Sequence, residues 1–140
     1  MEDLVESLTR GNPTEVKVVL ASVAFALAAY QLVLIAVGYG KLQPSFLAPR
    51  PASAAHRASG DAIVVILVVV AVMCVSVFGF EDDAVLHIAA GSALLAVLAL
   101  KIAVLRRWHG AGRFLPLLGT SVFILLALTW LSSAGSFLAD

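Results

Sequence analysis

The segment AIVVILVVVAVMCVSVFGF, residues 62–80, contains no charged side chain. A helix that crosses the hydrocarbon core of a membrane, about 30 Å thick, needs roughly 20 mainly apolar residues. The valines and isoleucines of this segment do not alternate with polar residues, and the segment is about twice as long as a strand of a membrane β-barrel. It therefore predicts a transmembrane helix.

Three other apolar segments of similar length predict an all-α fold: a polytopic membrane protein in which four transmembrane helices form one antiparallel bundle. The predicted spans are residues 16–38, 62–80, 85–105 and 114–131. Hydrophobic residues make up 61% of the 140 residues and charged residues 13%, about half the share that soluble domains carry. We therefore expect the lipid bilayer to surround this single domain, and the zero net charge gives no reason to expect nucleic acid as a partner.

The connections between the spans differ in composition. Residues 42–51 contain three of the five prolines and predict an extended loop at the membrane surface. The polar segment 53–61 is expected to form the first turns of the second helix. The short acidic segment 81–83 then leads directly into the third span.

The basic residues lie mostly on one side of the predicted bundle. Seven of the nine lysines and arginines fall there, and only Arg10 and Lys17 fall on the other side. Cytoplasmic loops of membrane proteins carry an excess of lysine and arginine. The sequence therefore predicts an integral protein of a prokaryotic cytoplasmic membrane with both termini outside.

A short repeat opens the second and third helices. His56 and His87 each begin the pattern His-x-Ala-x-Gly-x-Ala, which places Gly60 and Gly91 one helical turn after each histidine. Because consecutive spans are antiparallel, the two copies lie at opposite membrane surfaces and cannot share one metal ion. They indicate either one site in each leaflet or a coincidence in a chain rich in alanine and glycine.

His87 is the most deeply placed of the three histidines, and an ionisable residue inside a span is a functional candidate by default. A haem needs a flat cavity, one or two axial ligands and small residues beside the macrocycle, which Gly91 and Gly60 would supply. We therefore predict His87 as an axial ligand, Met73 as a sixth ligand and His56 as a ligand of a second site. The alternative for Met73 is a packing or lipid-facing role. His109, in a basic loop, is interpreted as a surface residue.

Two stripes run along the third helix. One stripe joins His87 through Gly91, Leu94 and Leu98 to Lys101, and the opposite stripe consists of alanines that include Ala89, Ala93 and Ala96. Rows of small residues allow helices to approach closely in lipid. We therefore expect the alanine stripe to pack on a neighbouring helix, with the His87 stripe lining a cofactor or a third helix.

Lys101 and Arg57 carry two alternative interpretations. Either side chain pairs with Asp61, the only acidic residue near a membrane core, or both bind the propionates of a haem. The ion pair requires only neighbouring positions, since Arg57 lies one turn before Asp61. The sequence leaves both alternatives open.

Together, these features resemble the small membrane b-type cytochromes of the cytochrome b-561 and ferric-reductase-like group. The resemblance rests on His-Arg-x-Ser-Gly at residues 56–60, His-x-x-x-Gly at residues 87–91 and Trp-Leu-Ser-Ser-Ala at residues 130–134. It implies a haem b held between helices, with one haem expected and a second one left open, and a quinone as a further candidate ligand. Those cytochromes use pairs of histidines, whereas this chain has Met73 where a second histidine ligand would be expected.

The resulting hypothesis is a membrane b-type cytochrome that passes electrons between quinol and a partner redox protein. So small a chain is expected to work with other membrane subunits of a redox complex, as an electron-transfer subunit and not as a stand-alone enzyme. The alternative is a haem-free anchor or accessory subunit of a respiratory or transport assembly. The chain contains no Cys-x-x-Cys-His, no phosphate-binding glycine loop and no His-Glu-x-x-His, which removes c-type haem attachment, nucleotide binding and zinc proteolysis from consideration.

Overall fold

A computed structural model describes residues 3–4, 7, 9–41, 45, 49–79 and 84–140. Within these residues the protein is helical and has four helices that are long and apolar enough to cross a membrane. They are α2 (Pro13–Gly38), α3 (Pro49–Met73) continued by a π-helical segment (Cys74–Phe78), α4 (Val85–Arg106), and α5 (Leu115–Trp130) continued by a second π-helical segment (Leu131–Gly135). A 3-10 helix (His109–Phe114) precedes α5, and the short α6 (Ser136–Ala139) follows it. The predicted all-α, four-span membrane fold is confirmed.

Helix α3 begins earlier in the chain than the sequence predicts. Pro49 and Pro51 were expected in an extended loop, but α3 begins at Pro49 and both prolines lie in its first turn. Proline is tolerated there because the first amides of a helix have no partner within it. Residues 42–44 and 46–48 of the predicted loop, and the acidic segment 81–83, lie outside the described residues.

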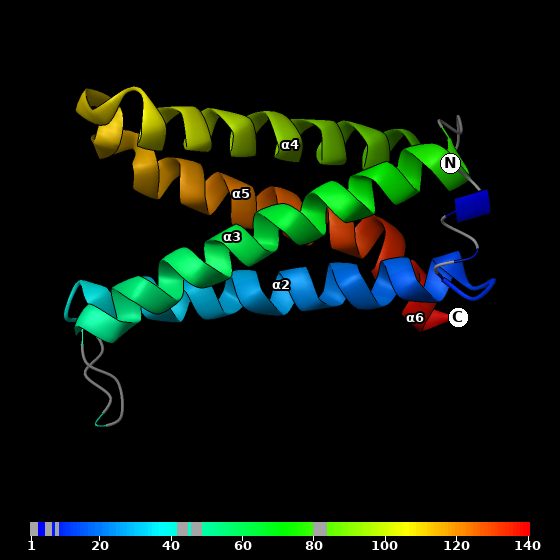
Figure 1. The fold of residues 1–140 in the computed structure, drawn as a ribbon, viewed down its shortest axis with the longest axis horizontal. Coiled ribbons are helices and arrows are strands. Elements are labelled where there is room, and N and C mark those ends of the chain that lie inside the picture. Colours follow the sequence, from blue (N-terminus) through cyan, green and yellow to red (C-terminus); the bar gives the residue numbers. More distant parts are fainter. Residues whose placement is uncertain (1–2, 5–6, 8, 42–44, 46–48, 80–83) are drawn as a thin grey trace.

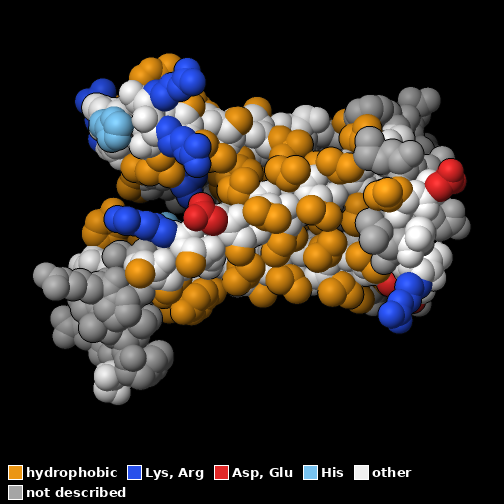
Figure 2. Space-filling view, in the orientation of Figure 1, with side chains coloured by type: hydrophobic (Ala, Val, Ile, Leu, Met, Phe, Trp, Pro, Cys, Tyr) orange, Lys and Arg blue, Asp and Glu red, His pale blue; other side chains and the backbone are white. Residues whose placement is uncertain are grey.

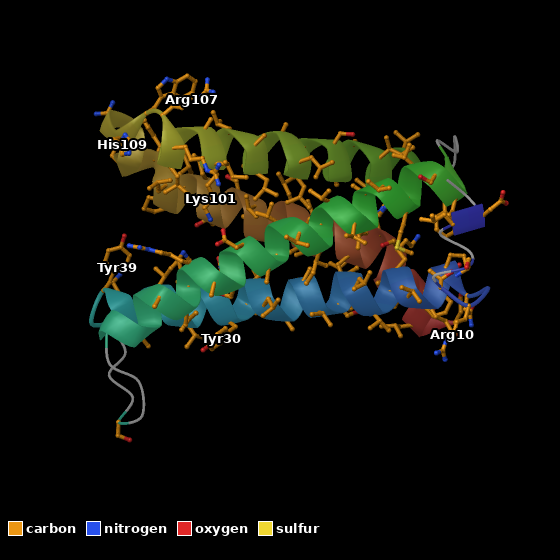
Figure 3. All side chains as sticks on the ribbon, viewed as in Figure 1. Arg10, Tyr30, Tyr39, Lys101, Arg107 and His109 are labelled. Carbon is orange, nitrogen blue, oxygen red and sulfur yellow. The ribbon has the colours of Figure 1, made fainter. Side chains whose placement is uncertain are left out.

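The four helices are arranged as two antiparallel pairs (Figure 1). Helix α2 packs along α3, α4 packs along α5, and α2 also contacts α5. Both chain termini lie at the same end of the bundle, which we call the terminal end (Figure 1). The opposite end carries Lys101, Arg107 and His109, and we call it the basic end (Figure 3).

The core joins the two pairs. Its buried residues come from all four helices: Ala24, Ala28, Ile63, Leu67, Leu94, Leu98, Val122 and Leu126. Next to it, the ring of Phe25 in α2 is stacked between two rings of α5, with centroid distances of 5.7 Å to Phe123 and 5.3 Å to Trp130. The Trp130 indole also donates a 3.0 Å hydrogen bond to the Ser22 hydroxyl. These contacts attach α5 to α2.

The alanine stripe of α4 does not pack as predicted. Ala89 and Ala96 are exposed and Ala93 is half-buried, whereas Leu94 and Leu98 of the His87 stripe are buried. The larger side chains of the His87 stripe provide the apolar contact with the other helices. The small alanines are left on the outer surface, where contact with lipid costs nothing.

The outer surface suits a bilayer. Large apolar side chains are exposed along the middle of the bundle, among them Val65, Val68 and Ile124. Figure 2 shows these hydrophobic side chains as a continuous band, with most of the visible lysine and arginine side chains gathered at the basic end. This distribution identifies the chain as an integral membrane protein.

Candidate functional site

A cavity of about 760 Å³ opens at the terminal end of the bundle. Four helical segments line it: the first turns of α2 and α4, the last turns of α3 and the end of α5. Most of its wall is apolar, and its polar groups include Lys17, His87, Thr129 and Ser132. Ligand cavities in proteins commonly measure about 300–1,000 Å³ and combine such an apolar wall with a few polar groups.

Both π-helical segments contribute to this cavity. Cys74, Val75 and Phe78 line it from the end of α3, and Ser132 and Ser133 line it from the end of α5. Wider turns of this kind are rare and occur often at functional sites, because they change the direction in which side chains leave the helix. The two segments face each other across a single cavity, which favours a ligand site there.

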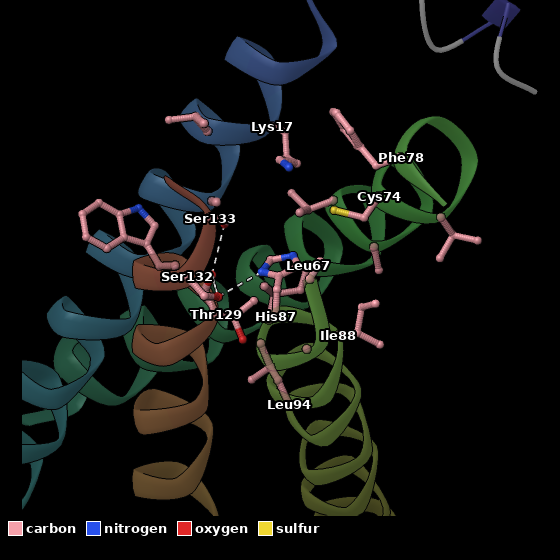
Figure 4. A pocket seen from close by; sticks show the side chains of 18 of the residues that line it. Lys17, Leu67, Cys74, Phe78, His87, Ile88, Leu94, Thr129, Ser132 and Ser133 are labelled. Carbon is pink, nitrogen blue, oxygen red and sulfur yellow. Dashed lines mark hydrogen bonds between the residues drawn. The ribbon is translucent and has the colours of Figure 1, made fainter. Parts of the chain in front are cut away.

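His87 is held in a defined orientation inside the cavity (Figure 4). Its Nδ1 lies 3.1 Å from the Ser132 Oγ, and that hydroxyl donates a 3.0 Å hydrogen bond to the Thr129 carbonyl oxygen. A serine hydroxyl has one proton, so in the arrangement in which it donates to Thr129, Ser132 accepts a hydrogen bond from His87. Nδ1 therefore carries the ring proton, and the Nε2 of the neutral ring keeps a lone pair available to a ligand.

The glycine at position 91 lies one helical turn after His87. Gly91 lines the cavity, and a β-carbon added there would come 3.9 Å from the Thr129 methyl group. Met73 does not line the cavity, although it is buried. The lining residues of α3 form one stripe at helical spacing, which includes Val70 and Cys74, and Met73 lies off that stripe. The structure thus brings Cys74, and not Met73, to the same cavity as His87.

The copy of the repeat that begins at His56 lies at the basic end and has different surroundings. The Gln31 side chain of α2 donates hydrogen bonds to the His56 carbonyl oxygen at 2.9 Å and to the Ser59 hydroxyl at 3.2 Å. A β-carbon on Gly60 would come 3.0 Å from the Gln31 Nε2. The sequence predicts a macrocycle beside Gly60, but the Gln31 amide fills this space. The His56 Nδ1 is buried and has no hydrogen-bond partner.

Replacing Gly60 with alanine is expected to displace the Gln31 amide. The loss of its two hydrogen bonds should lower the free energy of unfolding by about 1–2 kcal/mol relative to Gly38→Ala, which places a β-carbon in open space. Reversible denaturation in detergent measures both variants. In a Gln31→Ala background the penalty at Gly60 should disappear. A penalty that persists there would show that Gln31 is not its cause.

Lys101 and Arg57, which the sequence offers as ligands of haem propionates, also lie away from the cavity. Lys101 is half-buried near the basic end, with its Nζ 4.0 Å from the position of a β-carbon on Gly119. Arg57 and Asp61 are exposed on α3. Among the described residues no carboxylate lies within 4.0 Å of Lys101 or Arg57, so the predicted ion pair with Asp61 is not formed. The structure separates these residues from His87 by most of the length of the bundle.

The sequence did not identify three of the cavity residues that matter for its chemistry, Lys17, Cys74 and Ser132. Ser132 lies 45 positions after His87, and no local pattern connects them. Lys17 does carry a sequence signal, since it is a cation inside the first turns of an apolar helix. Cys74 lies inside an uncharged apolar segment, where no local pattern marks it as a site residue.

The fold and the cavity together define a four-span integral membrane protein with a histidine-containing cavity that opens at the terminal end. Residues 4–140 match the model of a family of unknown function, DUF6529, and the chain belongs to this family. No curated protein and no solved structure with which we compared the chain matches it.

Proposed function

We propose that this protein binds a b-type haem in the cavity at the terminal end, with the His87 Nε2 as the axial ligand of the iron. The observation that carries the proposal is the anchored His87 ring, whose Nδ1 is bonded to Ser132 while its Nε2 is left to the cavity. Histidines that ligate metals almost always donate their other ring N–H to a fixed acceptor, as this one does.

The residues of the cavity fit a haem better than a bare metal ion. Among the described residues no group of three or more histidines, cysteines or acidic residues is placed to hold a metal ion. A haem needs only one or two protein ligands, because the macrocycle supplies the other four nitrogens, and a single proximal histidine is an established arrangement. The cavity contains one histidine and no methionine among its described lining residues. The proposal is therefore one haem with His87 as its protein ligand.

Several residues of the cavity have separate roles in the proposed haem site. Ser132 orients the His87 ring and fixes its tautomer, and the Thr129 carbonyl oxygen orients Ser132 in turn. Gly91 lines the cavity near Thr129 and presents no side chain to it. Apolar residues such as Leu67 and Leu94 exclude water from the inner part of the cavity. When bound, the haem would supply one-electron exchange, and we propose quinol and a partner redox subunit as donor and acceptor.

The test is a visible absorption spectrum of the detergent-purified protein, expressed with haem supplied and measured before and after dithionite. The proposal expects a Soret band and reduced-state bands at about one haem per chain. A colourless protein that nevertheless remains folded would overturn it. The alternative, a haem-free anchor or accessory subunit of a membrane assembly, would then be the better interpretation of the bundle.

We also propose that the terminal end faces outward and the basic end faces the cytoplasm, because lysine and arginine are concentrated in cytoplasmic loops. Single cysteines at the exposed positions Asn12 and Gly110, each in a Cys74→Ser background, report on the two ends. An impermeant maleimide added to intact cells should label Asn12→Cys and leave Gly110→Cys unlabelled until the membrane is opened. The reverse pattern would invert the orientation. Labelling of both positions in intact cells would contradict the four-span topology.

A further inference from the structure

Lys17 places a positive charge at the edge of the cavity. It lies about one turn into α2, and both Lys17 and Phe78 line the cavity. The Lys17 Nζ lies 4.1 Å from the centroid of the Phe78 ring. This cation–π contact joins the first span to the end of the second span and holds the ammonium group beside the cavity instead of leaving it free in solvent.

The charged group of Lys17 lies in the same cavity as His87. Lys17 shares the lining of the cavity with His87 and Cys74, which lie on two other helical segments of its wall. Figure 4 shows the ammonium group pointing into the space between Phe78 and His87. Among the described residues no carboxylate lies within 4.0 Å of Lys17, although Asp140 also lines the cavity. A half-buried cation inside a membrane span is a functional candidate by default.

We infer that Lys17 is the anion-recognition residue of this cavity and binds a carboxylate of an amphipathic ligand whose ring system lies against His87. This inference rests on the proposed function, in which the carboxylate is a haem propionate. It moves the propionate contact from Arg57 and Lys101, which lie at the basic end, to a residue that shares the cavity with His87. Lysine and carboxylate form a charge-assisted hydrogen bond, which is strengthened where water is excluded.

A purely structural role would also account for the Phe78 contact, so the test must respond to the ligand's charge. The probes are ferric protoporphyrin IX and its dimethyl ester, which has the same ring and iron but no free carboxylates. Each is titrated into detergent-purified apoprotein, and the ratio of the two dissociation constants is compared between variants. Partition of the ester into detergent affects every variant equally and cancels in this comparison.

The wild-type protein is expected to bind the free acid about tenfold more tightly than Lys17→Met does, and the two proteins should bind the ester with similar affinity. Lys17→Arg should restore the preference for the acid. Lys41→Met, at an exposed position at the basic end, should leave the ratio unchanged. If Lys17→Met weakens both probes equally, or neither, the inference is wrong while the haem proposal stands. If the wild-type protein binds neither probe, both are wrong.

Discussion

Replacing His87 with alanine is expected to abolish the haem absorption bands of the purified protein. The reason is that the described residues of the cavity offer no second histidine and no methionine that could take over the iron. His109→Ala is the matched control, since that histidine is exposed at the basic end and should leave the spectrum unchanged. Circular dichroism of both variants establishes whether the helices remain folded. Retention of the normal spectrum by a folded His87→Ala protein would exclude this residue as the ligand.

The substitution Ser132→Ala tests whether Ser132 orients the His87 ring, because it leaves the proposed iron ligand in place. It keeps the imidazole but removes the acceptor 3.1 Å from Nδ1. Loss of such an orienting partner typically weakens metal binding by about 10–100-fold. We therefore expect the Ser132→Ala protein to bind haem at saturating concentration, with an affinity at least about tenfold lower. An unchanged affinity would mean that Ser132 does not position the ring.

Enlarging Ala24 is expected to cause a clear loss of stability. Ala24 is 0% exposed and lies in the core cluster where residues of all four spans meet. A leucine there has no space, and added methylene groups in a packed core cost about 1–3 kcal/mol. Ala96→Leu is the control, because Ala96 is exposed on the lipid-facing side of α4.

Denaturation in detergent and the yield of monodisperse protein measure both alanine variants. Ala24→Leu should lower the unfolding midpoint and the yield, and Ala96→Leu should match the wild-type protein. Sensitivity at Ala96 together with tolerance at Ala24 would mean that α4 presents its alanine stripe to another helix after all. That result would contradict the observed packing.

The sequence alone determined the four spans and the ends at which charges collect. Each span is long and apolar enough to be recognised without its neighbours, because the bilayer sets the length and every backbone group must bond within the helix. Periodicity also placed His87, Gly91, Leu94 and Leu98 on one face of α4. It could not tell whether that face or the alanine face lies inside, since both are apolar enough for either environment.

Only the tertiary structure decided what each repeated histidine-glycine pair does. Gly60 receives the Gln31 amide from α2, whereas Gly91 borders a cavity completed by α5. The partner of His87 is Ser132, and the cation beside it is Lys17 of the first span. These residues are far apart in the chain, and the packing of α2 on α3, of α4 on α5 and of α2 on α5 brings them together. A local pattern specifies the face of a helix, and the packing of the four helices determines which side chains from elsewhere meet that face.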